Sequence, residues 1–386
     1  MMVKPHFTIK NESQQYKSGR GFLFKDLLTP EILSDVCRRI TGKTDYTCTF
    51  DDTGYNKGRM ALLEYKNAQY FVSFSDTATN GRNSSVQSVT TALMNFHEEE
   101  NPQKKIFFYF LPSSGNHETD YLLFMYRLML TVGIEFLNPD VILAQPLSPF
   151  ISVEDVISAR NASRRRNRSN NSSYVTKGNN HVIQIFGKTY GANKYETTLL
   201  CIALSRISAN KIELYQICEQ TLEAIPQRCA NVINSLDNVK VFQTDLTMER
   251  NYFEKDENLR SPRFIYNLLA KIGSKNCALC GCEIPEIVQG AHIWPVAAIK
   301  REAGISLEQK LKYATDGNNG IWLCENHHKM LDEDIITIDM TGDIRCNADT
   351  IGANADFVDW STPTKKLSAS IMSKSFKMYL EKRNSI

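Results

Sequence analysis

Residues 277–280 read Cys-Ala-Leu-Cys and residues 324–327 read Cys-Glu-Asn-His, so two pairs of soft metal ligands share the same spacing. This spacing lets both side chains of one turn reach a single tetrahedral ion, with each Zn–S bond at about 2.3 Å. Two unrelated pairs of buried side chains are the alternative, which leaves the matched spacing as a coincidence. Cys282 could compete with Cys280, but a one-residue spacing is strained for a shared ion. The predicted ligands of a structural Zn²⁺ are Cys277, Cys280, Cys324 and His327.

The stretch between and after these pairs contains further groups that suit hydrolytic chemistry. Residues 290–295, Gly-Ala-His-Ile-Trp-Pro, predict a strand end, and residues 316–320, Asp-Gly-Asn-Asn-Gly, predict a turn. A helix is expected to begin near residue 324, and side chains four residues apart on it project from one face. Taken singly, these residues suit a structural histidine, a turn asparagine and a solvated carboxylate, but their joint arrangement favours a site. The candidate site residues are His292, Asn319, His328 and Asp332.

The order His, Asn, His inside a frame of cysteine pairs resembles the HNH, or ββα-metal, family of endonucleases. The resemblance covers roughly residues 276–346, and its linked spacings make it specific. It implies that His292 is the general base, that Asn319 is the central Asn of the motif and that His328 is the metal ligand on the helix. It also implies a zinc-stapled ββα-metal nuclease domain. Together with the mixed α/β pattern of the N-terminal region, this predicts the α+β fold class.

The chemistry of phosphodiester cleavage explains these residue types. A water molecule must lose a proton as it attacks phosphorus, and imidazole, with an ordinary pKa near 6.5, can accept that proton at neutral pH. A divalent cation, Mg²⁺ or Mn²⁺, neutralises the charge that builds on the phosphoryl oxygens, and His328 with Asp332 could hold it. We expect Asn319 to fix the ring of His292 through a hydrogen bond.

The chain departs from the family pattern at one position. Many members carry an acid or a histidine immediately before the general base, as a second metal ligand, but this chain has Ala291 there. Either Asp332 or Asp316 supplies the missing ligand, or the ion is held by His328, the DNA phosphate and water. Loss of metal binding, which would leave an inactive nuclease, is the further alternative.

The length and composition of the chain limit its number of domains and the class of protein it can be. At about 150 residues per domain, 386 residues predict two to three domains. Hydrophobic residues make up 42% and charged residues 23% of the chain, which excludes wholesale disorder, coiled coil and collagen. The 45 Lys+Arg against 43 Asp+Glu exclude a strongly basic protein, although not a local basic patch. With no secretory signal and no convincing membrane span, we expect a cytoplasmic protein with reduced cysteines.

The pattern of apolar and turn residues divides the chain into four parts. We expect a mixed α/β domain over residues 1–158, a basic loop or linker over 159–180, a mixed α/β recognition segment over 181–254 and the nuclease domain over 255–386. Because the nuclease core is small, the remaining chain is expected to recognise the target or to support dimerisation.

Residues 59–74 predict two strands joined by a short turn. Glu64-Tyr-Lys66, after Asp51 or Asp52, has the metal-binding pattern of another nuclease class. Such loose spacing is common by chance, so we expect an ordinary hairpin in which Glu64 and Lys66 face solvent.

Basic side chains outside the nuclease core are candidates for DNA contacts. Five of the nine residues from 160 to 168 are Arg and none is acidic, which suits a flexible arm in a minor groove, or alternatively a solvated linker. Two further Arg precede the first cysteine pair and could contact the DNA backbone, or cap and pack. The candidate DNA-binding residues are Arg164, Arg165, Arg166, Arg168, Lys188, Arg260 and Arg263.

These features together predict a metal-dependent, sequence-specific endonuclease of the restriction type that cleaves double-stranded DNA. Cleavage of both strands of a symmetric site favours a homodimer. A cognate DNA methyltransferase would then protect the host's own DNA. A modification-dependent nuclease that reads a methylated base is the first alternative, and a non-catalytic zinc-containing DNA-binding protein is the second.

Overall fold

The computed structural model describes nine ranges of the chain, which form two compact units. The described ranges are residues 3–10, 28–51, 60–75, 82–112, 118–162, 173–189, 193–218, 225–255 and 260–385. The first unit comprises residues 1–167, 188–209 and 223–240, and the second comprises residues 168–187, 210–222 and 241–386. The segment 181–254, expected as one recognition segment, is therefore divided between the two units.

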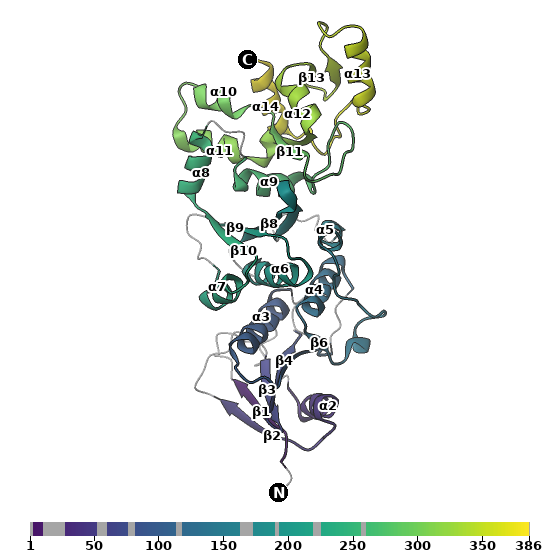
Figure 1. The fold of residues 1–386 in the computed structure, drawn as a ribbon, viewed down its shortest axis with the longest axis vertical. Coiled ribbons are helices and arrows are strands. Elements are labelled where there is room, and N and C mark those ends of the chain that lie inside the picture. Colours follow the sequence, from purple (N-terminus) through teal and green to yellow (C-terminus); the bar gives the residue numbers. More distant parts are fainter. Residues whose placement is uncertain are drawn as a thin grey trace. The chain divides into compact units, whose positions relative to one another are not determined.

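The first unit is built on a six-stranded sheet with the order β2-β1-β3-β4-β5-β6 (Figure 1). Strands β1, β3 and β4 are antiparallel, whereas β4, β5 and β6 are parallel. The strands are β1 (His6–Lys10), β2 (Thr47–Asp51), β3 (Met60–Tyr65), β4 (Ala68–Phe74), β5 (Lys104–Tyr109) and β6 (Glu135–Phe136). The helices are α2 (Pro30–Thr41), α3 (Arg82–Glu98), α4 (Asp120–Thr131), α5 (Val153–Ala162), α6 (Asn193–Ile207) and α7 (Gln227–Asn234).

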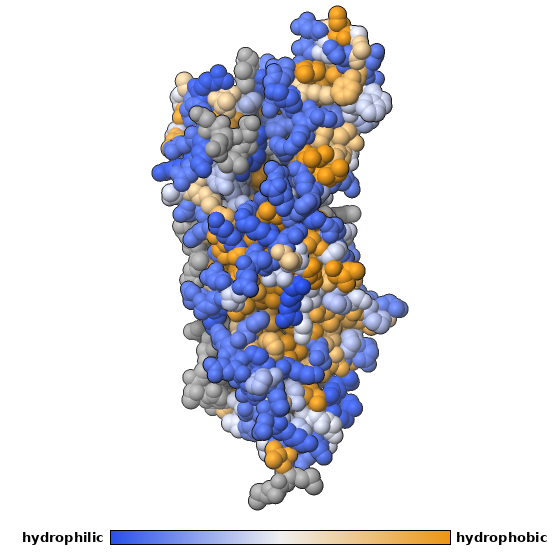
Figure 2. All heavy atoms as spheres, in the orientation of Figure 1, coloured by the Kyte–Doolittle hydropathy of each residue, from blue (hydrophilic) through white to orange (hydrophobic). Residues whose placement is uncertain are grey.

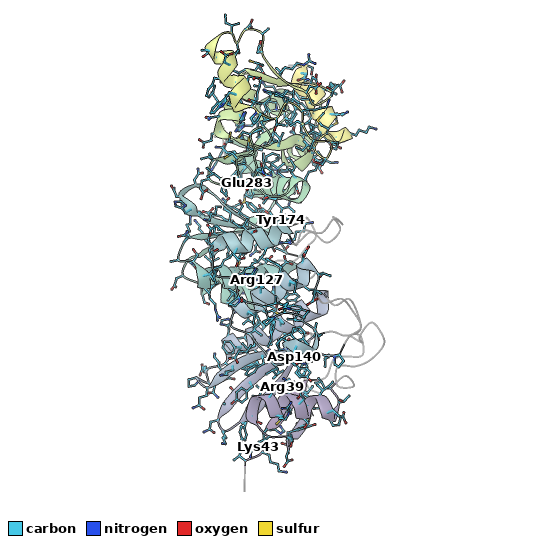
Figure 3. The ribbon with its side chains drawn as sticks, turned by 90° about the vertical axis from the view of Figure 1, so that its right-hand side faces the viewer. Arg39, Lys43, Arg127, Asp140, Tyr174 and Glu283 are labelled. Atoms are coloured by element: carbon cyan, nitrogen blue, oxygen red, sulfur yellow. The ribbon has the colours of Figure 1, made fainter. Side chains whose placement is uncertain are left out.

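Local sequence explains where several of these elements begin and end. Thr29 caps α2 by accepting a hydrogen bond from the backbone N–H of Ile32, and Gly42 ends the helix at a φ of 74°. Arg39 of α2 donates to the carbonyl oxygen of Leu137 at 2.8 Å, which ties the helix to the chain after β6 (Figure 3).

The expected hairpin of β3 and β4 is present. Lys66 and Asn67 form its two-residue turn with φ of 49° and 65°, as a type I′ turn requires. Glu64 and Lys66 are exposed, so the interpretation as an ordinary hairpin is confirmed. Asp52 lies outside the described residues.

The second unit contains most of a four-stranded sheet with the order β10-β9-β8-β7. Its strands are β7 (Tyr174–Lys177), β8 (Ile183–Lys188), β9 (Ile212–Ile217) and β10 (Val239–Thr244). The helices that follow β10 along the chain are α8 (Leu246–Glu254), α9 (Pro262–Ile272), α10 (Val296–Arg301), α11 (Leu307–Thr315), α12 (Glu325–Asp332), α13 (Ala353–Ser361) and α14 (Lys374–Asn384).

A short hairpin followed by a helix lies at the centre of this unit. Strands β11 (Val288–His292) and β12 (Gly320–Cys324) pair antiparallel, with His292 opposite Gly320 and Val288 opposite Cys324. Helix α12 begins immediately after β12, and the hairpin of β13 (Ile336–Ile338) and β14 (Ile344–Cys346) follows it. The described residues thus form an α+β protein with a ββα element at residues 288–332, as expected.

The surface of the second unit is apolar around α13, where Ile351 is 76% and Phe357 is 51% exposed. Figure 2 shows orange and tan residues at the surface where Figure 1 draws this helix. Among the residues that the structure describes, no helix combines the length and the apolar character needed to cross a membrane.

Candidate active site and metal centre

The two predicted ligand pairs meet at one point. The ligand atoms of Cys277, Cys280, Cys324 and His327 all lie within 4.8 Å of one another. The Sγ atoms of Cys280 and Cys324 are 3.9 Å apart, and Nδ1 of His327 lies 3.1 Å from Sγ of Cys324. Two sulfurs bound tetrahedrally at about 2.3 Å would be roughly 3.8 Å apart, so the cluster has the dimensions of a single metal site.

The surroundings of the cluster suit a cation. Oγ1 of Thr362, which is buried, lies 3.2 Å from Nε2 of His327 and can accept a hydrogen bond from it, which leaves Nδ1 directed at the thiols. Burial raises the pKa of Cys280 to about 12. Burial also acts to raise the pKa of Cys277, but its contacts with His327 and with backbone N–H groups lower it to about 6. The site therefore accommodates one thiolate by itself, and a divalent ion would stabilise the others. These residues fit a metal, and their sulfur-rich donor set suits Zn²⁺.

A tight turn presents the first cysteine pair. Gly281 adopts a φ of 71° and donates its N–H to the carbonyl oxygen of Cys277 at 2.8 Å. The backbone N–H of Cys277 bonds the carbonyl oxygen of Cys282, so Cys282 closes the turn through its backbone and is not part of the ligand cluster. Cys282 therefore does not replace Cys280 as a candidate ligand in this cluster.

His292 lies at the end of β11 and is 7% exposed. Its Nε2 lies 2.9 Å from the carbonyl oxygen of Ala314, and because a carbonyl only accepts, Nε2 carries the proton. The other nitrogen, Nδ1, is then an acceptor, and it is buried without a hydrogen-bond partner. Burial lowers the pKa of His292 to about 3, and the Arg260 guanidinium acts in the same direction. The ring is therefore neutral, and its accepting nitrogen is buried without a protein partner.

Phe264 of α9 holds this ring in place. The two rings stack with centroids 3.8 Å apart and planes inclined by 16°. Glycines on both strands make room for Phe264, because an added Cβ would come within 2.9 Å of its ring at Gly290 and 2.7 Å at Gly320. The two glycines thus leave room on the hairpin for the phenyl ring of Phe264. This ring in turn fixes the plane of the His292 imidazole.

Asn319 has a different role from the one expected. Its Oδ1 accepts from the backbone N–H of Trp294 at 2.7 Å, and its Nδ2 donates to the carbonyl oxygens of Trp294 and Tyr313. The expected hydrogen bond from Asn319 to the His292 ring is wrong, because the Ala314 carbonyl holds that ring instead. Asn319 therefore braces the backbone that follows β11, and it positions His292 only indirectly.

Asn319→Ala should be strongly destabilising. The side chain is 0% exposed, and its loss would leave the backbone groups of Trp294 and Tyr313 without these partners. Each buried group left unsatisfied costs about 1–3 kcal/mol, so we expect the free energy of unfolding to fall by about 3 kcal/mol or more. Urea unfolding measures this change. Asn251→Ala, at an exposed position of α8, is the control, and equal stability of the two variants would contradict the bracing role.

His328 and Asp332 lie on one face of α12, as expected. Nε2 of His328 is 3.4 Å from Oδ2 of Asp332, and Nη2 of Arg260 is 3.1 Å from the same nitrogen. Arg260 also donates from Nε to the carbonyl oxygen of Gly290 on β11, at 2.8 Å. Because a guanidinium only donates, Nε2 of His328 accepts, which is the neutral form that ligates metals.

One imidazole nitrogen and one carboxylate oxygen are donor types that fit a hard divalent cation. In this structure the Arg260 guanidinium occupies the lone pair of His328 Nε2, so Arg260 would have to move aside for an ion to bind there. Within the described ranges, the cysteine cluster is the only group of three or more His, Cys, Asp or Glu that could hold a metal. Asp316 does not supply a further ligand, because its oxygens accept from Asn318 and from the hydroxyl of Tyr379. Of the two carboxylates that could replace the ligand missing at Ala291, Asp332 agrees with these contacts better than Asp316.

The candidate DNA-binding residues differ in their contacts and in their exposure to solvent. Arg263 points inward and donates to the carbonyl oxygen of Cys218, so it packs within the second unit. Lys188 ends β8 and is half-buried. Arg164, Arg165, Arg166 and Arg168 lie outside the described residues. Among the candidates that the structure describes, only Arg260 lies beside His328.

The sequence interpretation missed the contacts that orient the histidines. Phe264, Ala314 and Thr362 are distant from His292 and His327 along the chain, and no spacing rule connects them. The two glycines of the hairpin were a usable signal, because a strand glycine often marks a close approach by another group.

Residues 277–339 match the family model described as HNH endonuclease. No curated protein sequence matches the chain. The match confirms the resemblance seen in the cysteine frame and the His, Asn, His order, and it supports a metal-dependent, DNA-cleaving hydrolase. The second unit of this chain therefore contains an HNH endonuclease domain.

Proposed function

We propose that this protein is a sequence-specific endonuclease of the restriction type that cleaves double-stranded DNA with His292 as general base. The observation that carries the proposal is the buried, unpartnered Nδ1 of His292, whose tautomer is fixed by the carbonyl of Ala314. This nitrogen, which no protein group occupies, is the atom that would accept the proton of an attacking water.

The neighbouring residues support the same chemistry. His328 and Asp332 would hold Mg²⁺ or Mn²⁺, which supplies charge neutralisation at the phosphate and the leaving oxygen. Arg260 connects the two histidine positions, because it bonds both Gly290 on β11 and His328 on α12. Its guanidinium is the group best placed to attract a phosphate to this hairpin. We infer that the cysteine cluster holds Zn²⁺ and fixes the start of α12.

The restriction-type assignment rests on the rest of the chain. The HNH match covers residues 277–339, whereas the first unit and the β7–β10 sheet lie outside it and offer surface for target recognition. We propose that the protein acts as a homodimer on a symmetric site and is linked to a protecting DNA methyltransferase.

Incubation of the purified protein with plasmid tests the proposal. We expect discrete fragments with Mg²⁺ or Mn²⁺, and sequencing of their ends would give the site and the stagger. Absence of cleavage with every divalent ion tried, on both methylated and unmethylated plasmid, would reject the enzyme. Cleavage of the methylated plasmid alone would replace the restriction-type assignment by the modification-dependent one.

A further inference from the structure

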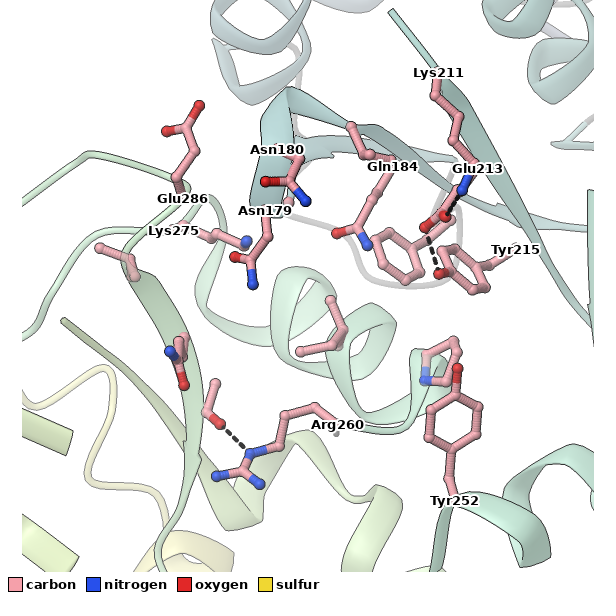
Figure 4. Close-up of a pocket in the computed structure, with 18 residues that line it drawn as sticks. Asn179, Asn180, Gln184, Lys211, Glu213, Tyr215, Tyr252, Arg260, Lys275 and Glu286 are labelled. Atoms are coloured by element: carbon pink, nitrogen blue, oxygen red, sulfur yellow. Dashed lines mark hydrogen bonds and ion pairs between the residues drawn. The ribbon is translucent and has the colours of Figure 1, made fainter. Parts of the chain in front are cut away.

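A pocket of about 820 Å³ lies within the second unit, beside the candidate active site. Strands β8 and β9 line one side of it, and the start of α9 and strand β11 line the other (Figure 4). This volume is within the range of about 300–1,000 Å³ that is typical of ligand sites. The chemistry described above uses only Arg260 and Gly290 of its lining, so most of the pocket has no role yet.

The two strands present an unusual face to this pocket. Gln184 and Phe186 alternate on β8, and Lys211, Glu213 and Tyr215 alternate along β9 and the residue before it, so all five share one face of the sheet. The residues between them are apolar and fully buried on the opposite face: Ile183, Ile185, Ile212 and Leu214. One face of this sheet is therefore an ordinary core, whereas the other combines aromatic rings with a carboxylate, an amide and an amine.

These groups are organised around Glu213. Lys211 donates to one of its carboxylate oxygens and the Tyr215 hydroxyl to the other, both at 2.8 Å. Burial acts to raise the pKa of Glu213, but these hydrogen bonds outweigh it and the pKa is lowered. Phe186 and Tyr215 stack with centroids 5.1 Å apart and planes inclined by 11°. The pocket thus holds an oriented acceptor beside flat aromatic surfaces.

The opposite side carries two cationic side chains, together with the carboxylate of Glu286 (Figure 4). Arg260 lines the pocket and bonds His328, so the pocket is continuous with the group that we place at the phosphate. Lys275 also lines it, anchored by hydrogen bonds to the carbonyl oxygens of Lys177 and Pro285. Figure 4 shows Arg260 across the pocket from Glu213 and Tyr215.

We propose that this pocket binds one nucleobase of the DNA substrate, turned out of the helix, and that Glu213 reads its amino edge. The proposal rests on the proposed function, because the nucleotide would reach the pocket from a phosphate bound near Arg260. A base is flat, stacks on aromatic rings and presents N–H donors that a carboxylate accepts. Adenine, cytosine and guanine carry such an amino group and thymine does not. Tyr252, which also lines the pocket, offers a further ring for stacking.

Fluorescence of 2-aminopurine tests this proposal without relying on cleavage. The duplex carries the site found by end sequencing, with 2-aminopurine placed at successive positions of each strand, and Ca²⁺ replaces Mg²⁺ to prevent cutting. We expect fluorescence to rise at one position or its neighbour when the protein binds, since the probe brightens as it leaves the stack. Glu213→Gln and Tyr252→Ala should abolish this rise and weaken specific binding by about 10- to 100-fold.

Glu308→Gln is the matched control, because it makes the same change on an exposed residue of α11. It should leave the fluorescence and the affinity unchanged. Two results would overturn the pocket proposal while plasmid cleavage persists: no fluorescence rise at any position, or a rise that survives both pocket variants. Failure to cleave any plasmid would instead reject the proposed function, so the two failures are distinguishable.

Discussion

Substitution of His292 by glutamine is expected to lower the rate of DNA cleavage by about 10²- to 10⁴-fold, the usual contribution of a positioned general base. The glutamine amide can still donate to the carbonyl of Ala314, but it offers no nitrogen that takes a proton from water. Because the native ring is already uncharged, binding of DNA in the presence of Ca²⁺ should change little. Single-turnover cleavage and a binding assay measure the two effects separately.

The control for this substitution is His6→Gln, which makes the same change on β1 in the other unit. It should cleave like the native protein. Cleavage by His292→Gln within tenfold of the native rate would contradict the assignment of the base. A parallel loss of binding and cleavage would show a structural role for His292 instead.

The protonation state of the His292 ring can be tested separately. Burial lowers the pKa of His292 to about 3, so its ring in the free protein should stay neutral between about pH 5 and 8. Its NMR signals, identified by their absence in His292→Gln, are expected not to shift over this range. Titration of those signals near the ordinary pKa of about 6.5 would show that the ring is solvated and not held as described.

Loss of the cysteine-bound metal is the second large effect that we expect. Cys324→Ser removes one of four clustered ligands and should abolish tight Zn²⁺ binding. Because binding of a structural Zn²⁺ is worth about 10–16 kcal/mol in small zinc domains, the ββα element should lose its fold and its cleavage activity. Metal analysis and hydrogen exchange of residues 277–332 measure the two consequences.

Cys282→Ser provides a matched control within the same turn. Its backbone carbonyl, and not its sulfur, is used there, so the variant should retain the metal and the fold. If both variants lost the metal equally, Cys282 would be a ligand and the assignment of Cys280 would be wrong. If neither lost it, the cluster would not be the metal site.

The cysteine cluster was predictable from the sequence because residues close to the ligands along the chain determine its geometry. Two pairs of ligands with equal spacing require only two turns brought together, and each turn is encoded by residues next to the ligands. The position of His328 and Asp332 on one face of α12 followed from helical periodicity in the same way. The N-terminal hairpin and α2 were also readable from turn and capping residues.

The contacts that tune the site were not predictable. Asn319 binds the backbone of Trp294 and Tyr313 and not the His292 ring, a choice set by which chain segments meet in the folded unit. The pocket face of β8 and β9 was not predicted, because nothing in the sequence indicated what lies opposite these strands. Local patterns therefore identified the candidate groups, whereas tertiary contacts decide which atom of each lacks a protein partner.

The neighbouring histidines of α12 have a consequence for engineering. Cys324 precedes the first turn of this helix, His327 faces the sulfur cluster and His328 faces Arg260. His327, which would anchor the helix through the metal, is therefore followed directly by His328, which would serve the reaction. A grafted copy of this cutting module would have to carry residues 277–332 as one block, because a recipient scaffold lacking the thiols could not reproduce the register of the helix.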